Sequence, residues 1–305
     1  MSMQRDEIAL RQENIEPEIK ALNGTGPGPH FDEHLTVIRP PKGWVSLRMD
    51  EVWAYRELLY FLVWRDIKVR YKQTTLGAAW AIIQPFFTMV VFSVFFSKLG
   101  GIKTGTDIPY PVWSFCALVP WQLFAHALSE SSNSLVSNER LVSKVYFPRL
   151  IIPMSAVLAG LVDFGIASVI LLGMMAFYGI VPGVAVLMLP LFLLLAVCTA
   201  LAVGLWLSAL NVQYRDVRYT IPFLTQIWLF ISPIAYPATQ VPEQWRALYG
   251  LNPMAGVVEG FRWALLGTEN TTGSMILVSA AVVLLLLVGG VMYFRKMERT
   301  FADVV

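Results

Sequence analysis

The sequence predicts an all-α integral membrane protein with six transmembrane helices, and three observations support this fold class. Of the 305 residues, 56% are hydrophobic and 14% are charged, whereas soluble domains average about 25% charged residues. The mean hydropathy is +0.59. Apolar segments of roughly 20 residues, enough to cross a bilayer as a helix, recur along the chain. Each must be helical, because hydrocarbon offers the backbone no hydrogen-bond partners.

The first 50 residues are predicted to form a polar cytosolic arm that is partly disordered. Acidic residues at Glu7, Glu13, Glu16 and Glu18 interrupt the apolar core that a signal peptide needs. The sequence NGTGPGP at 23–29 is typical of a loop or a flexible linker. The transmembrane domain is expected to occupy residues 75–305.

Residues 51–74 are predicted to form an amphipathic helix at the cytosolic membrane interface. On a helix the segment has two stripes, an aromatic one with Tyr60, Trp64, Ile67 and Tyr71 and a basic one with Arg65, Lys68 and Lys72. Aromatic rings beside cations suit a helix that lies among anionic head groups. Asp66 and Arg70 have the i, i+4 spacing of an ion pair. A solvated helix that only anchors the first span is the alternative.

Six segments have the length and apolarity of spanning helices. They lie at about 78–97, 112–136, 150–178, 184–210, 219–236 and 275–294. If the N-terminus is inside, most basic residues near the spans fall on the cytosolic side, within 56–72, 140–149, 215–218 and 295–299. Cytosolic loops carry this excess of Lys and Arg, so both termini are predicted to be cytosolic.

The loop between the second and third spans is predicted to contain a short cytosolic helix. Asn138 can cap it, and Pro148 prevents an unbroken helix into the third span. Leu141, Val142 and Val145 give this helix an apolar side that suits docking to a partner protein. An ordinary turn with a helical half is the alternative.

The outer segment between the fifth and sixth spans is predicted to form two short re-entrant helices. Pro242 and Gly250 bracket the first, and Pro253 and Gly267 bracket the second, with Asn252 as its cap. The second helix is too short to span and has an apolar face of Met254, Val258, Phe261 and Leu265. Glu259 and Arg262 either line an exit or pair with each other. A helical hairpin on the membrane surface is the alternative.

Several kinds of chemistry lack their residues in this sequence. There is no phosphate-binding G-x-x-x-x-G-K-[ST] motif and no set of residues with metal-ligand spacing. The 23 basic and 21 acidic residues nearly balance, which gives no reason to expect nucleic acid. Within the spans Asp163 and Glu130 are ionisable, and a helix-packing role is favoured for Asp163. A polyprenyl-linked membrane glycosyltransferase and a secondary carrier remain as alternatives to an ATP-driven permease.

Four segments resemble one family of transporters. They are RELLYFLVWRDIKVRYKQTTLGAAWAIIQP at 56–85, NVQYRDVRY at 211–219, LNP at 251–253 and the terminal FRKMERTFADVV. Together they resemble the permease subunits of polysaccharide ABC exporters, most closely the O-antigen (Wzm-type) group, with capsule and teichoic acid permeases as relatives. The resemblance covers residues 44–305. The arm at 1–43 is longer than this family leads us to expect.

The resemblance implies a type V ABC exporter fold in the bacterial inner membrane. It implies that this chain is not an enzyme and binds no cofactor, and that it forms a homodimer with two separate nucleotide-binding ATPase subunits, which hold ATP and Mg. The substrate would be a lipid-linked polysaccharide. The glycan, its linkage and acceptor lipid, a carbohydrate-binding domain on the ATPase, and the role of the arm are not specified by the sequence.

The resemblance also implies four groups of site residues. Substrate access would involve Arg65, Lys68, Lys72, Leu76 and Gly77. The channel would be lined by Trp80, Phe87, Phe92, Phe95, Phe96, Phe223, Trp228, Phe230 and Tyr236. Coupling to the ATPase would use Asn138, Glu139, Arg140, Leu141, Val142, Val145 and Tyr146. The outer gate would comprise Pro242, Trp245, Pro253, Met254, Val258, Glu259, Phe261 and Arg262.

Overall fold

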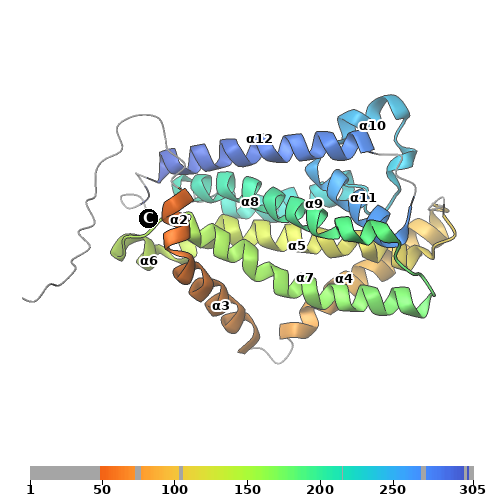
Figure 1. The fold of residues 1–305 in the computed structure, drawn as a ribbon, viewed down its shortest axis with the longest axis horizontal. Helices are drawn as coiled ribbons and strands as arrows, with labels where there is room; N and C mark the ends of the chain where they lie inside the picture. The colour runs from red at the N-terminus through yellow and green to blue at the C-terminus, as the bar shows by residue number, and fades with distance from the viewer. Residues whose placement is uncertain are drawn as a thin grey trace, which may run out of the picture. The chain divides into compact units, whose positions relative to one another are not determined.

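The computed structural model describes residues 49–72, 77–102, 106–214, 216–268, 273–298 and 301, and every regular element in these ranges is a helix. The predicted cytosolic arm up to residue 48 and the predicted access residue Leu76 lie outside the described residues. Figure 1 shows the long helices running side by side, with short helices gathered at their two ends.

Five helices are long and apolar enough to cross a membrane. They agree to within a few residues with the predicted first, second, third, fourth and sixth spans. In chain order they are α4 (Gly77–Phe92) with its π-helical continuation Ser93–Leu99, α5 (Tyr110–Ser137), α7 (Ile151–Phe177), α8 (Leu189–Gln213) with the preceding 3-10 turn Val184–Met188, and α12 (Gly273–Met297).

The predicted fifth span is represented by a shorter helix, α9 (Val217–Ile231), of 15 residues. Such a helix is about 22 Å long, whereas a hydrocarbon core is about 30 Å thick. The helix ends where Ser232 adopts an extended conformation before Pro233. Proline has no N–H to continue the helical ladder, so the chain leaves the helix here. The count of six spans therefore stays a prediction.

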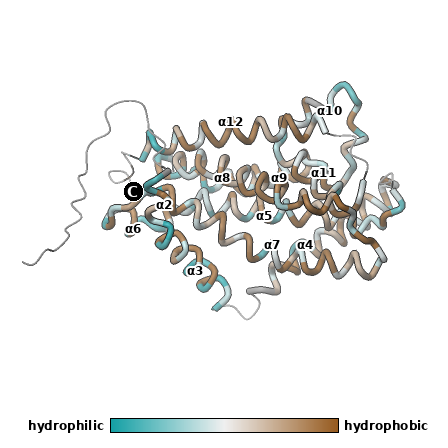
Figure 2. Tube along the Cα trace, in the orientation of Figure 1, coloured by the Kyte–Doolittle hydropathy of each residue, from teal (hydrophilic) through white to brown (hydrophobic). Residues whose placement is uncertain are grey.

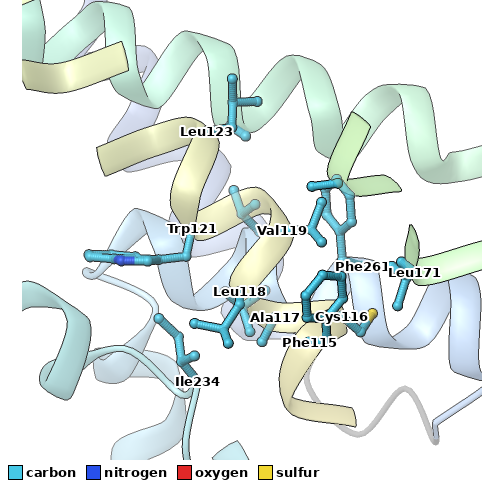
Figure 3. Packing of buried hydrophobic residues seen from close by; sticks show 14 of the residues in the cluster. Phe115, Cys116, Ala117, Leu118, Val119, Trp121, Leu123, Leu171, Ile234 and Phe261 are labelled. Atoms are coloured by element: carbon cyan, nitrogen blue, oxygen red, sulfur yellow. The ribbon is translucent and has the colours of Figure 1, made fainter. Parts of the chain in front are cut away.

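Helix α5 forms the centre of the bundle and is buried along most of its length. It packs against α7, α8 and α11. Figure 3 shows buried side chains of α5, among them Phe115 and Val119, packed with Leu171 of α7 and Phe261 of α11. Where α5 crosses α8, a Cβ at Gly204 would lie 2.4 Å from Ser131 Oγ, so a larger residue there would force Ser131 to shift.

Three short helices lie at one end of the bundle (Figure 1). They are α2 (Met49–Ala54), α3 (Arg56–Lys72) and α6 (Glu139–Lys144). The predicted single interface helix is thus two helices, interrupted at Tyr55. A second apolar cluster joins this end together, with Leu62 of α3, Val142 of α6 and Phe294 of α12 among its buried members. In Figure 2 this end is the more hydrophilic part of the helical bundle, beside largely hydrophobic long helices.

The opposite end carries α10 (Glu243–Tyr249) and the start of α11 (Pro253–Leu266). The start and stop signals predicted from the sequence are confirmed. The Asn252 side chain accepts a hydrogen bond from the backbone N–H of Met254 at 3.1 Å, and Gly267 ends α11 with a left-handed φ of 66°.

Candidate functional site

A polar cluster joins the end of α3 to α5 and α7 within the apolar bundle. The Arg70 guanidinium forms an ion pair with Asp163 and donates a hydrogen bond to a ring nitrogen of His126. The Tyr71 hydroxyl donates to the other oxygen of Asp163. Because Asp163 lies near the middle of α7, these contacts fix the end of α3 at a considerable depth along that helix. They agree with the helix-packing role favoured for Asp163.

This cluster corrects the pairing expected from sequence spacing. Asp66 was expected to pair with Arg70, but its carboxylate accepts from the neighbouring Arg65 at 2.8 Å and from the Ser155 hydroxyl at 3.4 Å. Arg70 points instead to Asp163, 93 residues away. The Asp66–Ser155 and Arg70–Asp163 contacts both join α3 to α7. Contacts between helices therefore override the i, i+4 pairing of Asp66 with Arg70 that α3 alone would allow.

The cluster also sets the ionisation of Tyr71. Burial raises the pKa of the Tyr71 phenol, and the hydrogen bond to Asp163 with the negative charge of that carboxylate raises it further. Tyr71 therefore remains a neutral hydrogen-bond donor to Asp163 at physiological pH. The carboxylate thus keeps two donors, one from each of two consecutive residues of α3.

A cavity of about 400 Å³ opens beside this cluster, between α4, α5 and α7. Its size lies within the usual range of small-ligand sites. The polar lining is contributed by Arg70, Gln84, Gln122, His126 and Asp163, and the apolar lining by Trp80, Ala81, Pro85, Val119, Leu123, Gly160, Phe164 and Ala167. Sequence reasoning assigned no site role to Arg70, Gln84, Gln122 or His126. The available signal was that three of them are polar residues inside predicted spans.

Of the predicted access residues that the structure describes, none lines the cavity. Arg65 is held by Asp66, and the Lys68 ammonium lies 5.2 Å from the centre of the Trp64 ring. Lys72 is exposed at the last position of α3, and Gly77 begins α4. The charged residue of α3 that does line the cavity is Arg70, two residues before the end of that helix.

Five of the predicted channel aromatics lie on surfaces that this chain leaves open. Trp80 and Phe87 on α4 are 63% and 62% exposed, and Phe95 follows on the π-helical continuation. On α9, Phe223 and Phe230 are exposed, while Ile221 is the residue of that helix that is buried. Helices α4 and α9 thus present aromatic faces outward. Such faces can contact lipid, pack against a second protein chain or line a channel.

The other four predicted channel aromatics pack within the chain. Phe92 is buried and stacks edge-on with Phe96, 5.2 Å between ring centres. The Trp228 indole donates to Asn252 Oδ1 at 2.8 Å and packs against a buried ring of α5. Tyr236 donates to the Ile231 carbonyl at 3.1 Å and bonds to a tyrosine of α10. These four residues therefore make packing contacts within the chain, and their role in a channel stays a prediction.

The predicted coupling segment contains the short helix α6, but its exposed side is not the expected one. Val142 is 3% exposed and belongs to the second apolar cluster, and Leu141 is partly buried. Val145 and Tyr146 are 52% and 68% exposed, so they form the apolar projection. Asn138 does not cap α6 with its side chain, which donates to the Ser134 carbonyl at the end of α5 instead.

Glu139 and Arg140 are exposed at the start of α6, and Lys144 is exposed at its end. The segment therefore presents exposed charged groups of α6 next to the Val145–Tyr146 projection that follows it. This combination of an apolar centre and a polar rim is typical of a surface that contacts another protein.

The predicted gate helix α11 is buried on almost all sides. The side chains of Met254, Val258 and Phe261 are at most 1% exposed. The opposite face of α11 is buried as well, because Gly256 and Gly260 lie close to neighbouring helices. A Cβ at Gly260 would lie 2.3 Å from the Phe192 ring of α8. In this state the predicted gate face therefore contacts protein rather than an opening, and movement of α11 stays a prediction.

Arg262 of α11 is fully buried and anchors the break after α9. Its guanidinium pairs with Glu259 at 2.9 Å and lies 3.3 Å from the centre of the Trp113 ring. It also donates to the carbonyls of Pro233 and Ile234, the latter at 2.9 Å. Of the two possibilities left open by the sequence, Glu259 and Arg262 thus adopt the paired one.

The remaining gate residues lie at the surface of the outer end. Pro242 precedes α10, and Trp245 within that helix is 53% exposed. Pro253 is the first residue of α11 and is buried. The short helix α10 therefore presents an aromatic group outward, whereas α11 is enclosed.

Comparison with known proteins identifies a family match. The model of the ABC-2 type transporter family matches residues 57–266, which run from the start of α3 to the end of α11. The matched region thus includes the polar cluster, the cavity, α6 and the Arg262 anchor.

Individual relatives are matched over most of their length. An O-antigen export system permease protein, RfbA, of Myxococcus xanthus is 28% identical over 256 residues, covering 83% of this chain and 97% of that protein. A protein of the same name from Klebsiella pneumoniae is 28% identical, covering 81% and 95%. The polysialic acid transport protein KpsM of Escherichia coli is 25% identical, covering 77% and 91%.

Proposed function

Because the chain belongs to the ABC-2 type transporter family, we propose that it is the membrane permease of an ATP-driven polysaccharide exporter. Its substrate would be a lipid-linked polysaccharide of the O-antigen type, carried across the bacterial inner membrane. One observation carries this proposal: relatives named for O-antigen export and for polysialic acid transport are matched over 91% to 97% of their own length. The likeness therefore extends over a whole permease and not over a shared module.

The exposed aromatic faces of α4 and α9 support a channel formed by two copies of the chain. Trp80 and Phe87 on α4 and Phe223 on α9 are each more than 60% exposed in the single chain. A second copy related by two-fold symmetry would place the same faces opposite each other. Flat aromatic rings can pack against the C–H groups of sugars without fixing them, which suits a polymer that must slide.

The ATPase subunits would dock at the end of the bundle that carries α6. Val145 and Tyr146 project there next to the charged residues of α6, and Asn138 before α6 donates a hydrogen bond to Ser134 of α5. A short helix attached in this way can transmit motion from an ATPase that closes on ATP and Mg. In the proposed arrangement the chain crosses the membrane six times and both termini are cytosolic. The residues that follow α9 would complete the fifth crossing.

The proposal is tested by removing the gene and restoring it on a plasmid together with its ATPase partner. We expect the deletion to abolish surface glycan while glycan accumulates inside, as measured by periodate staining of intact and permeabilised cells. The purified chain alone should show no ATP turnover, and turnover should appear when the ATPase subunits are added. Normal surface glycan in the deletion strain, or sugar transfer by the purified chain, would refute the proposal.

A further inference from the structure

The cavity beside Arg70 combines features that are unusual at this depth of an apolar bundle. Gln84 and Gln122 line it from α4 and α5, and among the described residues neither side-chain amide has a hydrogen-bond partner. The Gln84 side chain is exposed and that of Gln122 is partly buried, so both amides are free to bind a ligand in the cavity. Two such amides beside one cavity suit a polar occupant.

The charge of the cavity wall indicates what that occupant is. Arg70 is the cationic side chain of the lining, and it forms an ion pair with Asp163. The pair has no net charge, and Asp163 would repel an anion that approached Arg70. A phosphate group requires unneutralised cations or backbone N–H groups, so this wall favours an uncharged polar ligand.

The remaining lining residue that bears on recognition is Trp80. It lies one helical turn before Gln84 on α4, at i and i+4, so both side chains project from the same face. A broad aromatic ring beside amide groups suits a pyranose, which has an apolar face of C–H groups and an edge of hydroxyls. The amides offer both donors and acceptors to such an edge.

We propose that the cavity between α4, α5 and α7 is a subsite for one uncharged sugar unit of the exported glycan, with Trp80 as a platform and Gln84 and Gln122 as hydrogen-bonding groups. The Arg70–Asp163 pair forms a polar wall of zero net charge behind them. This inference rests on the proposed function and deepens it, because it assigns to this chain a contact with sugar rather than with the lipid diphosphate.

The first experiment changes the polarity and the charge of the cavity in the complete exporter. Gln84→Leu combined with Gln122→Leu should lower surface glycan roughly ten-fold, the effect of losing about one ligand hydrogen bond. Gln213→Leu, at the end of α8 and away from the cavity, is the matched control and should export normally. Gln84→Glu and Gln84→Lys should both retain more export than the leucine variants, because each keeps a hydrogen-bonding group.

The second experiment identifies the occupant directly. p-Benzoylphenylalanine is placed at Ala81 in the cavity wall or at Phe177, which is 84% exposed at the far end of α7. After irradiation of cells that make the exporter, the permease should carry a periodate-staining adduct at position 81 and none at 177. Protein amounts in the membrane, measured by immunoblot, show that each variant is folded and inserted.

The outcomes separate this inference from the proposed function. If the deletion strain lacks surface glycan but the leucine variants export normally and position 81 gives no glycan adduct, the sugar subsite is refuted and the function stands. If Gln84→Lys exports well while Gln84→Glu is inactive, the cavity holds an anionic group and the inference is refuted. If the deletion leaves surface glycan unchanged, both are refuted.

Discussion

The protein contains two arginine clusters in an apolar helical bundle, and they differ in what surrounds them. Arg262 at the outer end is fully buried, and its guanidinium contacts a carboxylate, two main-chain carbonyls and an indole ring. Arg70 has a side chain that is 29% exposed, and it borders a cavity with Asp163. The first cluster is closed by protein groups, whereas the second leaves space for a ligand.

If the cavity beside Arg70 is the sugar subsite proposed above, the same residue type serves structure in one place and function in the other. A buried ion pair stabilises little by itself, but removal of one partner leaves an uncompensated charge in the interior. Arg262 also satisfies two carbonyls that the break after α9 leaves without helical partners. Arg70 contacts one carboxylate and the His126 ring, and the amides of Gln84 and Gln122 in its cavity stay available. Four predictions follow in the order of their expected effect on stability, and the first and third test this comparison directly.

The largest effect is expected for Arg262→Met. This change leaves Glu259 and the carbonyls of Pro233 and Ile234 without their donor, so we expect a loss of about 3 to 5 kcal/mol. The measurement is thermal unfolding of the detergent-solubilised protein followed by tryptophan fluorescence. Arg246→Met is the matched control, because Arg246 also donates to two carbonyls but lies near the surface. Equal unfolding temperatures for the two variants would contradict a special role of Arg262.

The second effect concerns the close packing around α11. Gly256→Ala would place a Cβ 2.5 Å from the Cβ of Ser279 on α12, so the helices must separate, at a cost of about 1 to 3 kcal/mol. Gly165→Ala on α7 is the control, because no heavy atom lies within 4 Å of its added Cβ. It should be neutral or slightly stabilising, since alanine favours helix over glycine. Tolerance of Gly256→Ala would show that α11 is loosely held.

The third effect separates stability from transport at the Arg70 cluster. Arg70→Gln and Asp163→Asn should each cost about 1 to 2 kcal/mol, less than Arg262→Met, because both groups are partly accessible to solvent. The double variant should recover part of that loss, since neither charge is left alone. We expect export to fall in all three variants. Unfolding temperatures with surface glycan staining give both readouts, and full export by the double variant would exclude a functional role for the pair.

The smallest effect on stability is expected at the exposed projection near α6. Val145→Ser with Tyr146→Ser should change stability by no more than about 0.5 kcal/mol, because both side chains are exposed. Co-purification of the ATPase subunits and glycan export should nevertheless fall strongly. Val142→Ser is the matched comparison, since Val142 is buried three residues earlier and should mainly lower the unfolding temperature. Undiminished ATPase binding by the Val145/Tyr146 variant would place the docking site elsewhere.

Local sequence signals determined much of the helical framework. The apolar segments predicted five of the helices to within a few residues. The bounds of α11 followed from Asn252, Pro253 and Gly267, because a cap, a fixed φ and a left-handed stop act through neighbouring residues alone. The shortness of α9 was missed, since the Ser232–Pro233 step interrupts a segment whose composition suits a longer helix.

The tertiary structure alone decided which polar groups meet and which aromatic rings face outward. The partner of Arg70 is 93 residues away, although a carboxylate with suitable spacing was present on the same helix. The carbonyls that hold Arg262 belong to a loop 28 to 29 residues away. Phe92 and Trp228 turn inward while Phe87 and Phe223 face outward, although composition treats them alike. Such choices depend on how helices distant in sequence pack together, and periodicity along one helix carries no information about its neighbours.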